Sequence, residues 1–177
     1  MPLKLVEISL LLIIAVYQDI KTSKIKNFIT YPAVLVGLAT NTTLSGVGGL
    51  KDSLAGIIIP ILVLFVFYAL NMLGAGDLKL FGAIGSIMGV EFVLCDLAYS
   101  FISGGVMAII LISIRKNSFR RLKYLFNYLK SCALTLKLEK YQEFDGNDGL
   151  FRFSYAILAG SLITFSDGVF THILIRI

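Results

Sequence analysis

Apolar residues run along this chain in long, nearly unbroken stretches that short polar segments separate. A helix that crosses a bilayer needs about 20 mostly apolar residues. Continuous runs argue against a membrane β-barrel, whose strands alternate in polarity. The pattern therefore predicts an all-α integral membrane protein, with about six transmembrane helices in a single domain over residues 1–177. The expected helices are Leu3–Gln18, Phe28–Leu44, Ser53–Leu73, Leu78–Leu94, Leu97–Ile114 and Phe153–Ile173.

Composition and charge give this domain an orientation. Hydrophobic residues make up 57% of the chain, and the mean hydropathy of +0.87 is too high for a soluble domain. Lys and Arg accumulate in cytoplasmic loops. If the N-terminus lies outside, only Lys4, Lys51 and Arg176 of the 16 basic residues stay outside. We therefore expect a multi-pass protein of the cytoplasmic (inner) membrane. Its net charge of +5 favours anionic lipid over nucleic acid as a partner.

The one sizeable polar segment covers about residues 115–150. Its apolar residues recur near helical spacing with Arg and Lys between them, which predicts an amphipathic helix on the cytoplasmic membrane surface. Two roles stay open for this insert, a surface anchor or a lid beside an active site. The end of the last expected helix also stays open, because Ser166-Asp167-Gly168 could end it early.

Two aspartates stand at the cytoplasmic boundary in this topology. Asp19 follows the first apolar stretch, and Asp77 follows Gly74-Ala75-Gly76 at the start of the fourth. The glycines leave the backbone free in conformation and let another main chain come close. Two neighbouring carboxylates share a proton, because they resist ionising together. One can then activate water while the other polarises a carbonyl, as in an aspartic protease. The helix macrodipole predicts that Asp77 is the more acidic.

Other interpretations of these aspartates remain open. Either one alone is an ordinary helix-end residue. The pair could also carry protons in a small proton-coupled transporter or channel. Transporter sites generally lie near the bilayer midplane between repeated halves, whereas Asp19 and Asp77 lie at helix ends on one side and no internal repeat is visible. A non-enzymatic assembly factor is a third interpretation.

Three segments resemble those of a known family. Gly74–Leu80 resembles the G-x-G-D-x-K-[LF] signature of type IV prepilin peptidases, membrane aspartic peptidases of the GxGD class. Asp19–Asn27 resembles the first motif of that family, with Lys26 in place of the usual proline. Arg152–Gly160 is similar to a Pro-Tyr-x-Pro-Ala segment, with both prolines missing.

The resemblance implies a role for each matching residue. Asp19 and Asp77 would be the catalytic pair, without a metal or an organic cofactor. Gly74 and Gly76 would shape the active-site turn. Asn27 and Lys79 would support it, although Lys79 could equally be a positive-inside anchor.

The resemblance also implies a substrate class and a domain organisation. The substrates would be prepilin or pseudopilin precursors, cleaved after a short basic leader at the cytoplasmic membrane face. Bifunctional members carry a methyltransferase domain between the first two spans. Here only the segment 19–27 joins those spans, so we expect no methyltransferase domain. This organisation resembles the short, peptidase-only form of tight-adherence pilus systems.

Overall fold

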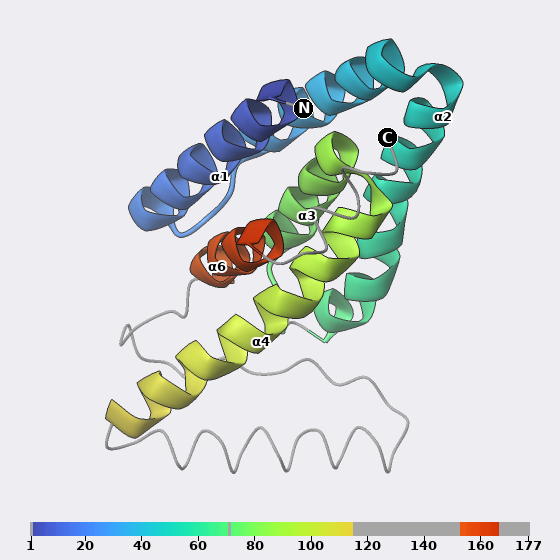
Figure 1. Ribbon diagram of the computed structural model, residues 1–177. Coiled ribbons are helices and arrows are strands. Elements are labelled where there is room, and N and C mark those ends of the chain that lie inside the picture. The colour runs from blue at the N-terminus through green and yellow to red at the C-terminus, as the bar shows by residue number, and fades with distance from the viewer. Residues whose placement is uncertain (1, 71, 115–152, 167–177) are drawn as a thin grey trace.

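The computed structural model describes residues 2–70, 72–114 and 153–166, and these residues form helices joined by short turns. No strand occurs within those ranges, so the all-helical prediction is confirmed there. The predicted insert at 115–150 and residues 167–173 of the last expected span lie outside the described residues. The helices, shown in Figure 1, are α1 Pro2–Thr22, α2 Asn27–Ala69, α3 Ala75–Met88, α4 Val90–Ile114 and α6 Phe153–Ser166.

Two of these helices are long and apolar enough to cross a membrane. They are α2 and the part of α4 over Val90–Leu111, while α6 is apolar but shorter. This agrees with a membrane protein, and the number of six spans stays a prediction.

Helix α2 contains two of the expected spans. Its backbone leaves the helical region at Gly46, where φ is 60° and ψ is −141°. Glycine adopts a positive φ without the steric cost of a Cβ, and the chain turns back on itself there (Figure 1). The second arm ends at Ala69, not at Leu73 as predicted. The N–H of Met72 donates to the carbonyl of Phe67 at 2.9 Å, which closes the helix although the following residues are apolar.

The predicted boundary between the fourth and fifth spans is wrong. The break falls at Gly89, with φ of 93°, and not near residues 95–96. The N–H of Gly89 donates to Gly85 at 2.8 Å to end α3, and the N–H of Val90 donates to Asp52 Oδ1 at 3.2 Å to start α4. Hydropathy could not find this boundary, because apolar residues flank it on both sides. Asp96 consequently lies inside α4 and not in a loop.

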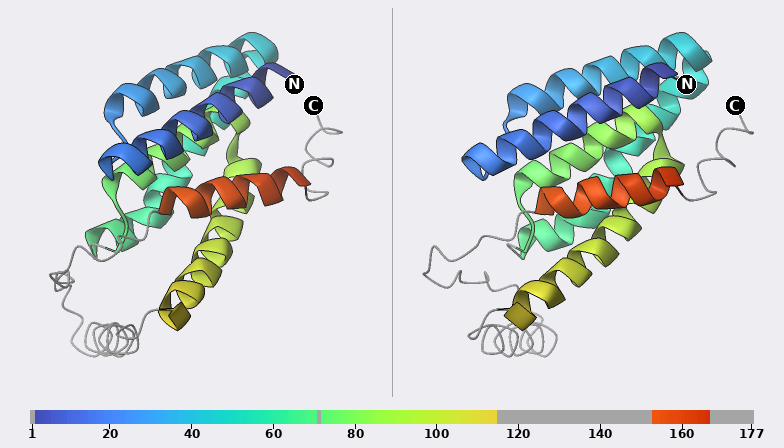
Figure 2. Two further views of the ribbon diagram at one scale, coloured as in Figure 1. Left: turned by 90° about the vertical axis from the view of Figure 1, so that its left-hand side faces the viewer. Right: turned by 60° about the vertical axis from the view of Figure 1, so that its left-hand side comes forward.

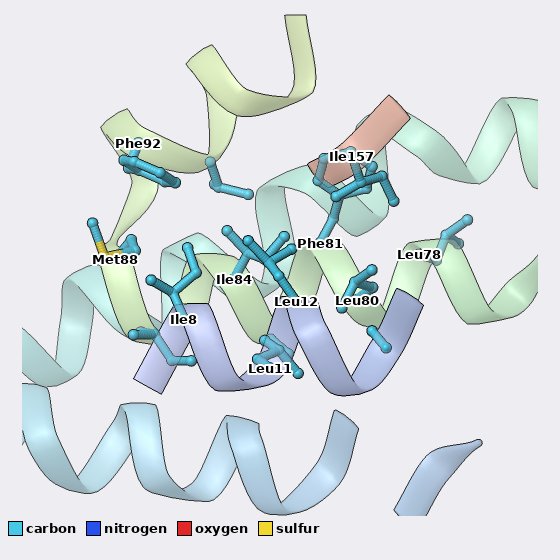
Figure 3. Packing of buried hydrophobic residues seen from close by; sticks show 14 of the residues in the cluster. Ile8, Leu11, Leu12, Leu78, Leu80, Phe81, Ile84, Met88, Phe92 and Ile157 are labelled. Carbon is cyan, nitrogen blue, oxygen red and sulfur yellow. The ribbon is translucent and has the colours of Figure 1, made fainter. Parts of the chain in front are cut away.

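Helix α3 lies at the centre of the arrangement. It contacts α1, α2 and α4, and α6 lies against α1 and α4. Figure 3 shows apolar side chains of α1, α4 and α6 that meet those of α3. Gly56 of α2 and Gly85 of α3 approach so closely that a Cβ on either would overlap the carbonyl of the other. Such small residues let helices pack closely where lipid provides little hydrophobic driving force.

The antiparallel path gathers different helix ends at opposite ends of the bundle. One end of the bundle holds the C-terminus of α1 and the N-termini of α2, α3 and α6 (Figure 2). We call it the aspartate end. We call the other end, which holds the start of α1, the bend of α2 and the α3–α4 junction, the far end.

Candidate active site

Asp19 occupies the last turn of α1. Asp19 is only 8% exposed, and its backbone carbonyl accepts the N–H of Ser23 at 2.9 Å where the helix ends. The hydroxyl of Ser154, at the start of α6, donates to Asp19 Oδ2 at 2.5 Å. A carboxylate from the first helix is therefore held by a hydroxyl from the last described one.

Asp77 occupies the first turn of α3. Its N–H donates to the carbonyl of Gly74 at 3.1 Å, and its Oδ2 accepts the N–H of Gly74 at 3.3 Å. An acidic side chain at this position satisfies an otherwise unpaired donor of the helix start and complements the macrodipole. Asp77 is half-buried, so part of its carboxylate stays open to a substrate or water.

The two carboxylates interact electrostatically. Asp77 precedes the apolar segment of α3, and burial raises its pKa from 3.8 to about 6. The hydrogen bond from Gly74 lowers this pKa, and the nearby charge of Asp19 raises it. The helix macrodipole and the hydrogen bond from Gly74 favour the anion of Asp77, but burial outweighs the hydrogen bond. Asp77 therefore takes up a proton far more readily than an exposed aspartate.

The glycines of the Gly-x-Gly motif provide space and not unusual backbone angles. Gly74 has φ of −75° and ψ of 146°, which any residue adopts, and neither Gly74 nor Gly76 has a positive φ. The expected conformational freedom is therefore not used. The expected close approach is present, because a Cβ on Gly76 would lie 3.1 Å from Ile25 Cβ and 3.4 Å from its nitrogen. The α1–α2 loop thus lies directly against the start of α3.

The two predicted supporting residues meet in one hydrogen bond. Lys79 Nζ, on α3, donates to Asn27 Oδ1, at the start of α2, at 2.7 Å. The same ammonium lies 5.8 Å from the ring centre of Tyr31, within the range of a cation–π contact. Asn27 and Lys79 therefore link the starts of α2 and α3 beside Asp77.

Sequence reasoning missed three residues of this site. Ser154 falls within the Arg152–Gly160 segment, but a serine opening an apolar helix looks like an ordinary N-terminal residue. Ile25 lies within the Asp19–Asn27 motif and Tyr31 within the second expected span, but only the fold places them against Gly76 and Lys79. The motifs that contain Ser154 and Ile25 gave neither residue a role.

Metal-binding groups do not gather in the described part of the chain. No three His, Cys, Asp or Glu side chains come close enough there to hold an ion. That the chain works without a metal or a cofactor stays a prediction.

Comparison with known proteins places the chain in a family. It is 31% identical over 98 residues to the prepilin leader peptidase/N-methyltransferase of Vibrio cholerae serotype O1, a match that covers 52% of this chain and 37% of that protein. The chain thus spans much less than two thirds of the length of that relative, and no solved structure matches it. The sequence model of the type IV leader peptidase family matches residues 7–109, more than half of the 177 residues, including Asp19 and Asp77. The chain therefore belongs to the type IV leader peptidase family.

Proposed function

We propose that this protein is a membrane aspartic endopeptidase that removes the short basic leader of prepilin-like precursors at the cytoplasmic membrane face. One observation carries the proposal. Asp19 and Asp77 come from different helices to the same end of the bundle, and the charge of Asp19 raises the pKa of Asp77. Membership of a leader peptidase family, and a relative named as a prepilin leader peptidase, support the substrate class.

The reaction follows from two carboxylates that share one proton. The ionised aspartate takes a proton from water, and the water oxygen attacks the carbonyl carbon of the scissile peptide. The protonated aspartate donates a hydrogen bond to the carbonyl oxygen and stabilises the charge that develops there. The carbon–nitrogen bond then breaks, and the amine nitrogen leaves with a proton from the pair.

The residues around the pair would hold it in place. The contact of Gly76 with Ile25 keeps the α1–α2 loop beside α3, so the helix ends that carry Asp19 and Asp77 stay adjacent. Gly74 caps α3 and donates to Asp77. The Lys79–Asn27 hydrogen bond links α3 to α2 next to this point. We propose that these residues support catalysis by fixing the distance between the carboxylates.

The distribution of basic residues supports the proposed orientation. Within the described ranges, the aspartate end carries Lys21, Lys24, Lys26 and Lys79, and the far end carries Lys4 and Lys51. Cytoplasmic loops are the ones rich in Lys and Arg. This bias favours an N-terminus outside and a site at the cytoplasmic face, where a leader peptide would be accessible.

Co-expression with a panel of prepilin-like precursors tests the function. We expect loss of the leader, read by mass spectrometry, from at least one precursor with the wild-type chain and from none with an Asp19→Asn/Asp77→Asn double variant. Equal processing by both chains would contradict the aspartic mechanism. Proton flux into liposomes that depends on the aspartates, without any processing, would instead support a transporter.

A further inference from the structure

The structure holds a buried hydroxyl against one of the two aspartates. Ser154 is fully buried, and its Oγ donates to Oδ2 of Asp19, which is itself buried. We infer that Ser154 is a positioning residue for Asp19, which fixes the orientation of this carboxyl within the aspartate pair. This inference rests on the proposed function of the aspartate pair.

The hydrogen bond from Ser154 determines which oxygen of Asp19 is available for the reaction. The hydroxyl occupies Oδ2, so Oδ1 remains for a water molecule. Asp77, whose burial favours the protonated form, is then the member that donates to the substrate carbonyl. This assignment is the reverse of the one that the macrodipole alone predicts.

A second polar contact sets the position of α6 along its axis. Ser161 lies seven residues after Ser154, about two helical turns farther along the same face. Its Oγ donates to Asp96 Oδ2 at 3.0 Å, and Ser100 donates to Asp96 Oδ1 at 3.2 Å. All three of these residues are fully buried. A carboxyl of α4 therefore holds α6 two turns away from the serine that contacts Asp19.

Close packing at the same level limits any sliding of α6. A Cβ on Gly160 would overlap the backbone and side chain of Ser100 on α4. Interlocked buried surfaces resist small displacements. A shift of α6 along its axis would have to break the Asp96 contacts before it could separate Ser154 from Asp19. The position of the donor is thus determined by packing between α4 and α6, away from the reacting atoms.

The test compares hydroxyl removal at two buried positions of α6. Ser154→Ala removes the donor, and Ser154→Cys keeps a weak one. Thr164→Val is the matched control, because Thr164 is fully buried on the same helix but donates to Gly160 of its own helix. Each variant is assayed for kcat and KM on a cleaved precursor and for thermal unfolding in detergent.

We expect kcat to fall about tenfold or more in Ser154→Ala, the range of a hydrogen bond to a charged group. KM should stay near its wild-type value, while the unfolding temperature should fall because a buried carboxyl loses its donor. Ser154→Cys should recover part of kcat, and Thr164→Val should leave kcat unchanged. Ser161→Ala should lower kcat less and should add nothing in the Ser154→Ala background, since both act through Asp19.

A Ser154→Ala chain with kcat within twofold of wild type would overturn the inference. A Ser154→Ala chain with lower stability or a changed KM but an unchanged kcat would also overturn it, because that pattern indicates that Ser154 serves packing alone. If Ser154→Ala does not fold, an unchanged kcat in Ser154→Cys overturns the inference in its place. Failure of the proposed function looks different, because Asp19→Asn and Asp77→Asn would then leave processing intact.

Discussion

The two ends of the bundle both bury polar side chains, but they do so in opposite ways. At the far end, Asn41 Nδ2 donates to Ser53 Oγ at 2.7 Å, to the carbonyl of Ser86 at 2.8 Å and to that of Ile87 at 3.0 Å. Asp52 accepts the N–H that starts α4. Asn41 and Asp52 thus complete the hydrogen bonding at the end of α3 and the start of α4, so these two groups of the far end serve the fold.

At the aspartate end, two like charges come close together. The charge of Asp19 makes ionisation of Asp77 harder, and burial adds to this effect. A neutral pair of side chains would fill the same space without that repulsion. Arrangements of this kind, with a perturbed carboxyl beside a second one, are concentrated at functional sites. The comparison teaches that burial of polar groups alone does not point to a site, whereas a carboxyl with a perturbed pKa beside a second carboxyl makes the aspartate end the candidate site.

The largest expected effect is on precursor processing, which should depend on the carboxylates of the aspartate end and not on Asp52 of the far end. Asp19→Asn or Asp77→Asn should each lower precursor processing by about three orders of magnitude or more, and the double variant should be no worse, since the pair acts as a unit. Asp52→Asn keeps an oxygen that can accept the N–H of Val90 and should retain processing. Processing is measured from the ratio of cleaved to uncleaved precursor after co-expression.

The membrane should separate the two ends as well. In a background without Cys95 and Cys132, cysteines at the exposed positions Lys24 and Thr42 mark the aspartate end and the far end. An impermeant thiol reagent added to intact cells should label Thr42→Cys at least tenfold more than Lys24→Cys, with equal labelling after lysis. Labelling of Lys24→Cys from outside would place the aspartates on the wrong side for a cytoplasmic leader.

Two asparagines of α2 allow a comparison of stability. Asn41→Ala leaves the carbonyl of Ile87 without its side-chain donor and that of Ser86 with the Ser53 hydroxyl alone, and we expect a loss of about 1–3 kcal/mol in unfolding free energy. Asn27→Ala breaks an exposed hydrogen bond to Lys79 and should cost less than about 1 kcal/mol. Processing should fall severalfold in Asn27→Ala. Equal destabilisation by both substitutions, measured by thermal unfolding in detergent, would remove the distinction between the two ends.

The sequence predicted the parts of this structure that depend on local pattern. Long apolar runs predicted helices, and the Gly-x-Gly-Asp motif together with the motif that begins at Asp19 singled out two aspartates that the fold brings to the same end of the bundle. The break at Gly46 falls within the predicted connection between the second and third spans. The break at Gly89 was not predicted, because Ile87, Met88 and Val90 continue the apolar run around it. Hydropathy measures burial and carries no information on backbone angle.

The residues that hold the site were harder to find, for a different reason. Ser154 meets Asp19 only because α6 packs against α1 and α4, and that pairing joins distant parts of the chain. Asn27 and Lys79 were predicted as supports, but nothing in either motif indicated that they bond to each other. Contacts between distant segments depend on packing, which one sequence does not display.

The smallest expected effect tests the repulsion between the carboxylates directly. Burial is the first cause of the raised pKa of Asp77, and the charge of Asp19 is a lesser one. Asp19→Asn should therefore lower that pKa only slightly. The measurement is the pH dependence of the protonated-carboxyl infrared band, assigned by its loss in Asp77→Asn. Its midpoint should lie at about pH 6 in the wild type, move lower in Asp19→Asn and stay unchanged in Asp52→Asn.

The same raised pKa has a consequence for stability. Because the folded-state pKa of Asp77 lies above its ordinary value of 3.8, folding takes up a proton as the pH passes between 3.8 and about 6. The burial of this carboxyl therefore lowers stability above that window and has no effect below it. The unfolding temperature of the wild type should fall as the pH rises through the window, and the fall should be smaller in Asp77→Asn. Two results together would contradict this picture: an infrared midpoint of Asp77 that does not move in Asp19→Asn, and identical pH profiles of unfolding in Asp77→Asn and wild type. The carboxylates would then not interact, and the aspartate end would resemble the far end.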